Sequence, residues 1–145
     1  MFLGGYFGSR LMMSIRERGG YTYGIRASLN YHKNCSYLCI RSSIKKGCSD
    51  KVIEEIKKEI NILRTELVQS NELESFKQFF IGEMISSISS PFVPISQYQT
   101  IKVLNLESNF YSKLAKTFIT ITSQQIMDIS NKYLNAENFS SVIIK

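Results

Sequence analysis

The sequence is poor in histidine and cysteine. It contains one histidine, His32, and three cysteines, Cys35, Cys39 and Cys48, with no Cys-x-x-Cys pair among them. One imidazole cannot supply the two nitrogen ligands that catalytic zinc commonly takes from a protein. An odd number of cysteines without paired spacing favours free thiols over a disulfide framework. We therefore expect no catalytic zinc site in this chain.

Long apolar runs and blocks of like charge are also missing. No apolar run approaches the ~20 residues that a membrane-spanning helix needs, so we expect a soluble chain without a membrane span. The formal net charge is +6, but the basic residues are scattered or stand in short doublets at residues 45–46 and 57–58. Nucleic acids select clustered basic surfaces, because affinity comes from neutralising neighbouring phosphates. We expect a solvated basic surface and no nucleic-acid partner.

The size and composition indicate one globular domain. The chain has 145 residues, of which 43% are hydrophobic and 21% charged, which is enough to bury a real core. Residues 3–18 repeat apolar side chains at helical spacing, through Phe7, Leu11 and Ile15, and predict a helix. Glycines at positions 4, 5 and 8 interrupt its first turns, which indicates either a closely approaching backbone or a frayed helix start. Gly19-Gly20 is expected to end this helix in the left-handed conformation.

Alternating apolar and polar residues then predict two strands. Residues 21–31 place Tyr21, Tyr23, Ile25 and Ala27 in one phase, and residues 36–44 continue the alternation after a turn at residues 32–34. The two strands should pair as an antiparallel hairpin. Later segments are predicted as helices at residues 49–67, 71–88, 95–106, 110–118 and 122–133, followed by a closing strand at residues 139–144. This order predicts an α+β fold, an antiparallel sheet with its helices packed mainly on one face.

The first 24 residues carry a family resemblance. Residues 9–11 read Ser-Arg-Leu, residues 16–17 read Arg-Glu, a Gly-Gly turn follows, and Tyr23 stands seven positions after Arg16. This pattern resembles the helix-to-strand signature in the C-terminal half of insulinase-like or pitrilysin-like M16 zinc peptidases, which close a chamber around peptides. The resemblance implies a LuxS/MPP-like metallohydrolase half-domain that lacks its first strands. Residues 1–145 would then form a single partial domain of the M16 C-terminal type.

The resemblance also implies that zinc and the substrate-contacting residues Arg16 and Tyr23 lie in different halves of the peptidase. The catalytic half of such peptidases holds zinc with a His-x-x-Glu-His motif and a further glutamate, and this sequence has no such motif. Zinc is therefore expected in a separate N-terminal half or partner subunit, and no cofactor is expected in this chain. The resemblance thus implies that the chain by itself hydrolyses nothing. By resemblance, Arg16 and Tyr23 would contact the backbone of an extended peptide substrate. Both side chains carry donors that could stabilise charge on a scissile carbonyl, whereas Arg10 is expected to be structural.

Several alternatives remain open at this level. Arg16 could pair with Glu17 on a solvated helix end. Tyr23 is in phase with Ile25, so we expect its ring to be buried, while its hydroxyl could still reach the surface at the start of the strand. The whole chain could instead resemble the inactive scaffold subunits of the family, which hold partners together without cutting peptides. A sheet without its first strands exposes backbone groups and apolar side chains, so we also expect the chain to associate with a partner or with itself.

Overall fold

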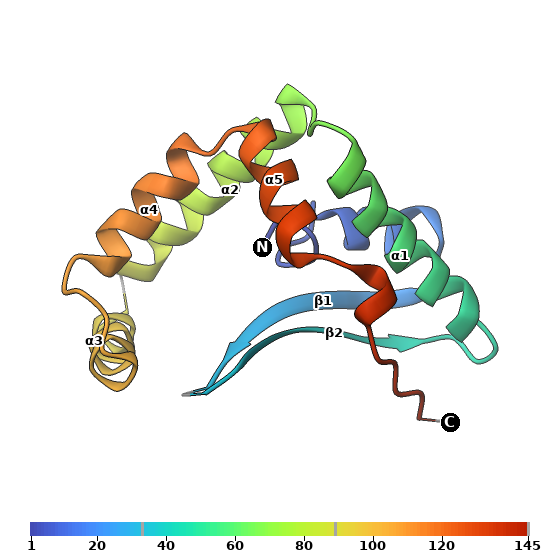
Figure 1. Cartoon of the computed structure of the whole chain (residues 1–145), viewed down its shortest axis with the longest axis horizontal. Helices are drawn as coiled ribbons and strands as arrows, with labels where there is room; N and C mark the ends of the chain where they lie inside the picture. The colour runs from blue at the N-terminus through green and yellow to red at the C-terminus, as the bar shows by residue number, and fades with distance from the viewer. Residues whose placement is uncertain (33, 89, 145) are drawn as a thin grey trace. The chain divides into compact units, whose positions relative to one another are not determined.

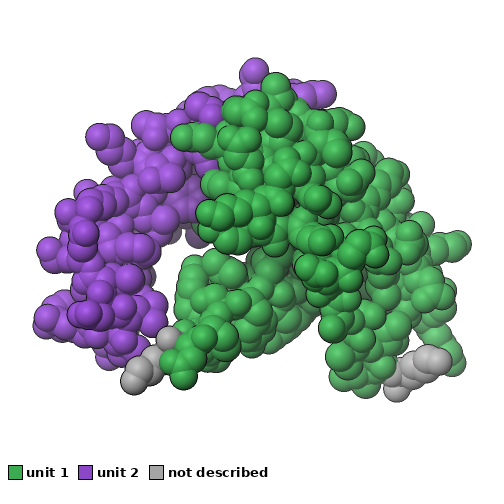
Figure 2. Space-filling model, in the orientation of Figure 1, with its two compact units in different colours: residues 1–68, 124–145 green, residues 69–123 purple. Residues whose placement is uncertain are grey.

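The computed structural model describes residues 1–32, 34–88 and 90–144. The chain divides into two compact units, one formed by Met1–Val68 with Gln124–Lys145 and the other by Gln69–Ser123 (Figure 2). Every residue that the sequence predicts for the functional site lies in the first unit.

The first helix begins later than predicted. Residues 2–9 form turns and bends, and helical structure starts at Arg10 and continues as the π-helix η1, Met12–Arg18. The reason is close packing at Gly4, whose carbonyl oxygen accepts a hydrogen bond from the backbone N–H of Ala27 at 2.7 Å. A Cβ atom on Gly4 would lie 2.9 Å from that nitrogen. The close backbone approach inferred from the early glycines is confirmed at Gly4, while the predicted helix is wrong before Arg10.

The predicted hairpin is present. Gly20 ends the helical region with φ +59°, as predicted, and leads into β1, Thr22–Tyr31, which pairs antiparallel with β2, Ser36–Ile44. At the connection, the backbone N–H of His32 donates to the carbonyl oxygen of Cys35 at 2.8 Å. The middle of the predicted turn, residue 33, lies outside the described residues. Within the described chain, β1 and β2 make up a two-stranded sheet.

The helices of the first unit lie on the same side of this hairpin (Figure 1). They are η1, α1 (Ser49–Thr65) and α5 (Ser123–Tyr133), and a short 3-10 helix, η2 (Ala136–Asn138), follows. Leu11, Ile15 and Ile60 are fully buried at the centre of the core. Leu67, which falls within the helix predicted at residues 49–67, is 56% exposed because α1 has already ended at Thr65. The α+β class is confirmed, and within the first unit the helices lie on one face of the sheet.

The second unit contains α2 (Ser70–Ile88), α3 (Phe92–Leu104) and α4 (Phe110–Thr120). Its core is aromatic, because Phe118 of α4 stacks on Phe80 with ring centroids 4.1 Å apart and also contacts Phe76. Helix α3 starts three residues before the predicted residue 95. Pro94 is accommodated in its first turn, where backbone N–H groups have no partner within the helix.

The predicted closing strand is not formed. Residues 139–144 have no regular secondary structure, and Val142 and Ile144 are 89% and 93% exposed. This segment, β2 and α1 line a cavity of about 810 Å³. An apolar, β-branched sequence forms a strand only beside another strand, and here a cavity separates the segment from β2.

Candidate functional site

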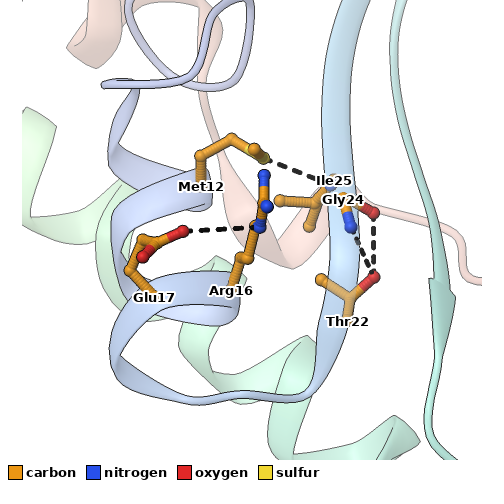
Figure 3. Close-up of polar contacts among 6 residues, drawn as sticks. All are labelled: Met12, Arg16, Glu17, Thr22, Gly24 and Ile25. Carbon is orange, nitrogen blue, oxygen red and sulfur yellow. Dashed lines mark hydrogen bonds and ion pairs between the residues drawn. The ribbon is translucent and has the colours of Figure 1, made fainter.

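The π-helix η1 directs Arg16 toward β1. The sulfur atom of Met12 accepts a hydrogen bond from the backbone N–H of Ile25 at 3.5 Å, so this face of η1 contacts the strand. Arg16 follows Met12 by four positions, close to one helical turn, and therefore leaves the helix on the same face (Figure 3). π-helical segments are rare and frequently occur at functional sites.

Arg16 has two neighbours of its own. Its Nε atom lies 3.4 Å from Oε1 of Glu17, and its guanidinium carbon lies 4.8 Å from the centre of the Phe7 ring. The ion pair that the sequence left open is therefore present. Phe7, which the sequence places on the apolar repeat of the predicted helix, is 59% exposed because its segment is not helical. The terminal guanidinium nitrogens of Arg16 form no hydrogen bond within the described part of the chain, so these donors remain available to a ligand.

Tyr23 lies on the solvent side of β1. Its relative exposure is 94%, so the predicted burial of its ring is wrong. The cause is a β-bulge, because Thr22 pairs with Ile44 while Ile25 pairs with Ser42, which leaves two residues of β1 opposite one residue of β2. The extra residue breaks the alternation of side chains. The phenol therefore points away from the core and presents its hydroxyl to solvent.

A small hydrogen-bond network holds the bulge (Figure 3). The buried Thr22 hydroxyl donates to the carbonyl oxygen of Ser43 at 2.5 Å and accepts from the backbone N–H of Gly24 at 3.1 Å. The Ser42 hydroxyl donates to the Gly24 carbonyl oxygen at 2.9 Å. Sequence reasoning missed this network, although an isolated glycine inside a strand pattern is a known signal for a bulge. Thr22 and Gly24 thus position Tyr23.

Arg16 and Tyr23 stand on adjacent elements, joined by the tight turn at Gly19-Gly20. The backbone N–H of Gly20 donates to the Arg16 carbonyl oxygen at 3.0 Å, and a Cβ atom on Gly19 would lie 2.6 Å from the ring of Tyr21. Among the described residues, no hydrogen bond or ring contact joins the Arg16 and Tyr23 side chains. The structure therefore brings the two predicted residues to the same turn without direct contact.

The other sequence-predicted groups lie outside this arrangement. The guanidinium carbon of Arg10 lies 5.8 Å from the centre of the Phe2 ring, and His32 stacks on Tyr37 at the end of the hairpin. Within the described ranges, no three side chains of histidine, cysteine, aspartate or glutamate are grouped to hold a metal ion. No helix in the same ranges has the length and apolar character needed to cross a membrane.

The fold matches several solved structures. The crystal structure of a peptidase M16 inactive domain from Pseudomonas fluorescens aligns with a TM-score of 0.82 and 24% identity, over 93% of this chain and 32% of that chain. A protease from Helicobacter pylori aligns with a TM-score of 0.82 and 15% identity, over 93% and 33%. A conserved protein from Enterococcus faecalis V583 aligns with a TM-score of 0.70 and 16% identity, over 90% and 30%.

The chain thus spans about a third of the length of these structures. A search of curated proteins finds no match. Residues 1–79, which include η1, the bulge and both strands, match the family model of the peptidase M16 inactive domain. The resemblance seen in the sequence is confirmed, and the chain belongs to the family of peptidase M16 inactive domains.

Proposed function

We propose that the chain is the non-catalytic, substrate-positioning half of a zinc-dependent M16-like endopeptidase. It would act beside a half or subunit that carries the His-x-x-Glu-His motif and the zinc ion. The observation that supports this role best is the position of Tyr23, whose fully solvent-facing phenol is held out by the bulge at Thr22. An exposed tyrosine ring on a backbone segment that a hydroxyl network holds is well suited to contact a ligand, because its apolar ring and polar hydroxyl can both take part.

The metal chemistry would belong to the partner half. The described residues of this chain offer no cluster of metal ligands, and zinc held elsewhere would polarise the scissile carbonyl and activate water. This chain would contribute hydrogen-bond donors. The Tyr23 hydroxyl would donate to a carbonyl oxygen of an extended peptide, and the terminal nitrogens of Arg16 would donate to a second oxygen nearby.

The ion pair between Arg16 and Glu17 favours a second candidate. A guanidinium already paired with a carboxylate and covered by the Phe7 ring is suited to stabilising the turn around η1. In that case the chain would be an inactive M16-like scaffold that holds a partner subunit and has no part in proteolysis. The two candidates differ in whether Arg16 and Tyr23 affect turnover.

Steady-state kinetics on the assembled peptidase separates them. The chain is co-purified with the His-x-x-Glu-His-bearing half from the same organism and assayed on a fluorogenic peptide, with the chain plus zinc alone as the blank. Substrate positioning predicts that Tyr23→Phe lowers kcat/KM about tenfold, as expected for one lost hydrogen bond of about 1.4 kcal/mol. Arg16→Gln should lower it at least as much.

The matched control is Tyr31→Phe, which removes a hydroxyl from another exposed tyrosine of β1. This variant should keep the parent kcat/KM. Unchanged turnover in Tyr23→Phe and Arg16→Gln, with the two halves still co-purifying, would support the scaffold instead. Hydrolysis by the chain alone with added zinc would contradict both candidates.

A further inference from the structure

Two arginines face each other across the hairpin. Arg26 of β1 and Arg41 of β2 are direct partners in the antiparallel register, and both are exposed. Side chains of directly opposite residues project from the same face of a sheet with Cβ atoms about 4.5–5.5 Å apart, so like charges in this position repel each other. The repulsion between the two guanidinium groups lowers the stability of the hairpin locally, and an anion bound between them would remove it.

Neither arginine has an acidic partner in the described chain. Arg16 pairs with Glu17 and Arg18 pairs with Glu59, but no ion pair or side-chain hydrogen bond of Arg26 or Arg41 is formed among the described residues. Their donors therefore face solvent. Guanidinium groups present rigid forks of N–H donors that match the two oxygens of a carboxylate.

The same two arginines line a cavity of about 310 Å³. Its other walls come from the N-terminal segment and from the bulged end of β1, namely Gly4, Gly5, Tyr6, Met12, Gly24 and Ile25. A Cβ atom on Gly24 would meet nothing within 4 Å, so this wall is open. Glycines lack a side chain and let a ligand backbone come close. The cleft is thus walled by glycine and apolar groups and carries two positive charges.

We propose that this cleft binds a carboxylate of an extended peptide, with Arg26 and Arg41 as its two ligands. The inference rests on the proposed function and narrows the substrate class to peptides that place a carboxylate, from a side chain or from the C-terminus, in this cleft. Arg26 follows Tyr23 by three positions along β1, which corresponds to about 10 Å in a strand. In a peptide that follows the strand, the carboxylate would stand about three residues from the residue whose backbone contacts Tyr23.

The test is a binding titration of the 145-residue chain by fluorescence anisotropy. Three labelled peptides of equal length are compared: one with a central glutamate and an amidated C-terminus, one neutral with a free C-terminus, and one neutral and amidated. The variants are Arg26→Gln, Arg41→Gln, Arg26→Lys and Tyr23→Phe. Lys46→Gln is the charge control, because it removes one positive charge from an exposed loop residue.

Binding of a carboxylate in the cleft predicts at least a tenfold loss of affinity for a carboxylate-bearing peptide in Arg26→Gln and in Arg41→Gln. Lys46→Gln should change this affinity less than twofold. The loss of affinity in Arg26→Lys should lie between these two values, because an ammonium group is charged but lacks the fork geometry. The melting temperatures of the two glutamine variants should equal or exceed that of the parent, because a like-charge contact is removed. Whether the glutamate peptide or the free C-terminus responds identifies the source of the carboxylate.

Other outcomes overturn the proposal. An equal loss in Lys46→Gln and Arg26→Gln would show general attraction to a basic surface, and binding of none of the peptides would leave no role for the cleft. If the neutral amidated peptide binds as tightly as the others and only Tyr23→Phe weakens it, the cleft is refuted while the proposed function stands. If the arginine variants alone weaken binding and Tyr23→Phe changes neither binding nor turnover, the cleft stands and the role of Tyr23 is refuted.

Discussion

Arg18 donates a hydrogen bond from Nη2 to Oε1 of Glu59 at 3.0 Å and thereby joins the last residue of η1 to α1. Glu59 is buried, whereas 70% of the Arg18 side chain is exposed, so the carboxylate depends on its partners more than the guanidinium does. Arg16 lies two residues before this ion pair. The contact therefore holds the end of the helix from which the proposed substrate contact projects.

Removing this partner should destabilise the protein. We expect Arg18→Ala to lower the free energy of unfolding by about 1–2 kcal/mol, because a buried carboxylate loses a charged hydrogen-bond donor. Urea denaturation measures the change. Lys57→Ala is the control, since it breaks an exposed pair with Glu54 at 3.6 Å and should cost at most about 0.5 kcal/mol. Equal losses in the two variants would show that the link between η1 and α1 contributes no more than a surface pair.

The close approach at Gly4 makes a second prediction. Gly4→Ala would place a Cβ atom 2.9 Å from both the nitrogen and the Cβ atom of Ala27, so the N-terminal segment must move away from β1. We expect a loss of about 1–3 kcal/mol in the free energy of unfolding, which is typical of overpacking. Gly82→Ala in α2 is the matched control, because its Cβ atom would meet nothing and should stabilise the helix by about 0.5–1 kcal/mol. A stable Gly4→Ala variant would refute the packing role of this glycine.

Local periodicity predicted those parts of the fold that depend on local sequence. The strand at residues 36–44 was predicted with its observed bounds, and the helix starting at residue 49 and the Gly20 cap were predicted as they occur. Errors arose where a distant segment decides the conformation. The first helix is cut short because Gly4 packs against Ala27, which lies far along the chain. The closing strand fails because pairing needs a neighbour, and periodicity carries no information about neighbours.

In the candidate site, too, local sequence predicted some features, while distant segments determine the others. The Arg-Glu, Gly-Gly and Tyr pattern predicted that Arg16 and Tyr23 would flank one turn, and the structure has them there. Their surroundings could not be predicted from the pattern. The ring of Phe7 reaches Arg16 because the N-terminal segment folds back, and Tyr23 faces solvent because a bulge shifts the strand by one residue. That both residues contact a substrate stays a prediction.

The bulge itself can be tested through Thr22. Thr22→Val keeps the shape of the side chain but removes the hydroxyl that bonds to Ser43 and Gly24. We therefore expect the free energy of unfolding to fall by about 1–3 kcal/mol. Without the network, the strand can regain regular pairing and turn the Tyr23 ring inward. Thermal denaturation measures the stability, and tetranitromethane nitration with peptide mass spectrometry measures the accessibility of Tyr23.

Thr65→Val is the control for this change. The Thr65 hydroxyl donates to the Asn61 carbonyl oxygen at an exposed position near the end of α1, so its loss should cost less than about 0.5 kcal/mol. Nitration of Tyr23 should stay at the parent level in this variant. If Thr22→Val also left stability and nitration unchanged, the hydroxyl network would have no part in positioning Tyr23.

The exposed C-terminal segment leads to a prediction about association. Val142 and Ile144 present apolar side chains to solvent, and within the described chain β2 has a strand on one edge only. Unpaired edges and exposed apolar groups favour contact with another chain, so the parent should self-associate with rising concentration in sedimentation velocity.

The double variant Val142→Asp/Ile144→Asp should remain monomeric, because burying the new charges in an interface is costly. Val103→Asp places one such charge at a 75% exposed position in α3 and should associate like the parent. A parent that stays monomeric would refute the predicted self-association. A Val103→Asp variant that dissociates equally well would place the contact surface elsewhere.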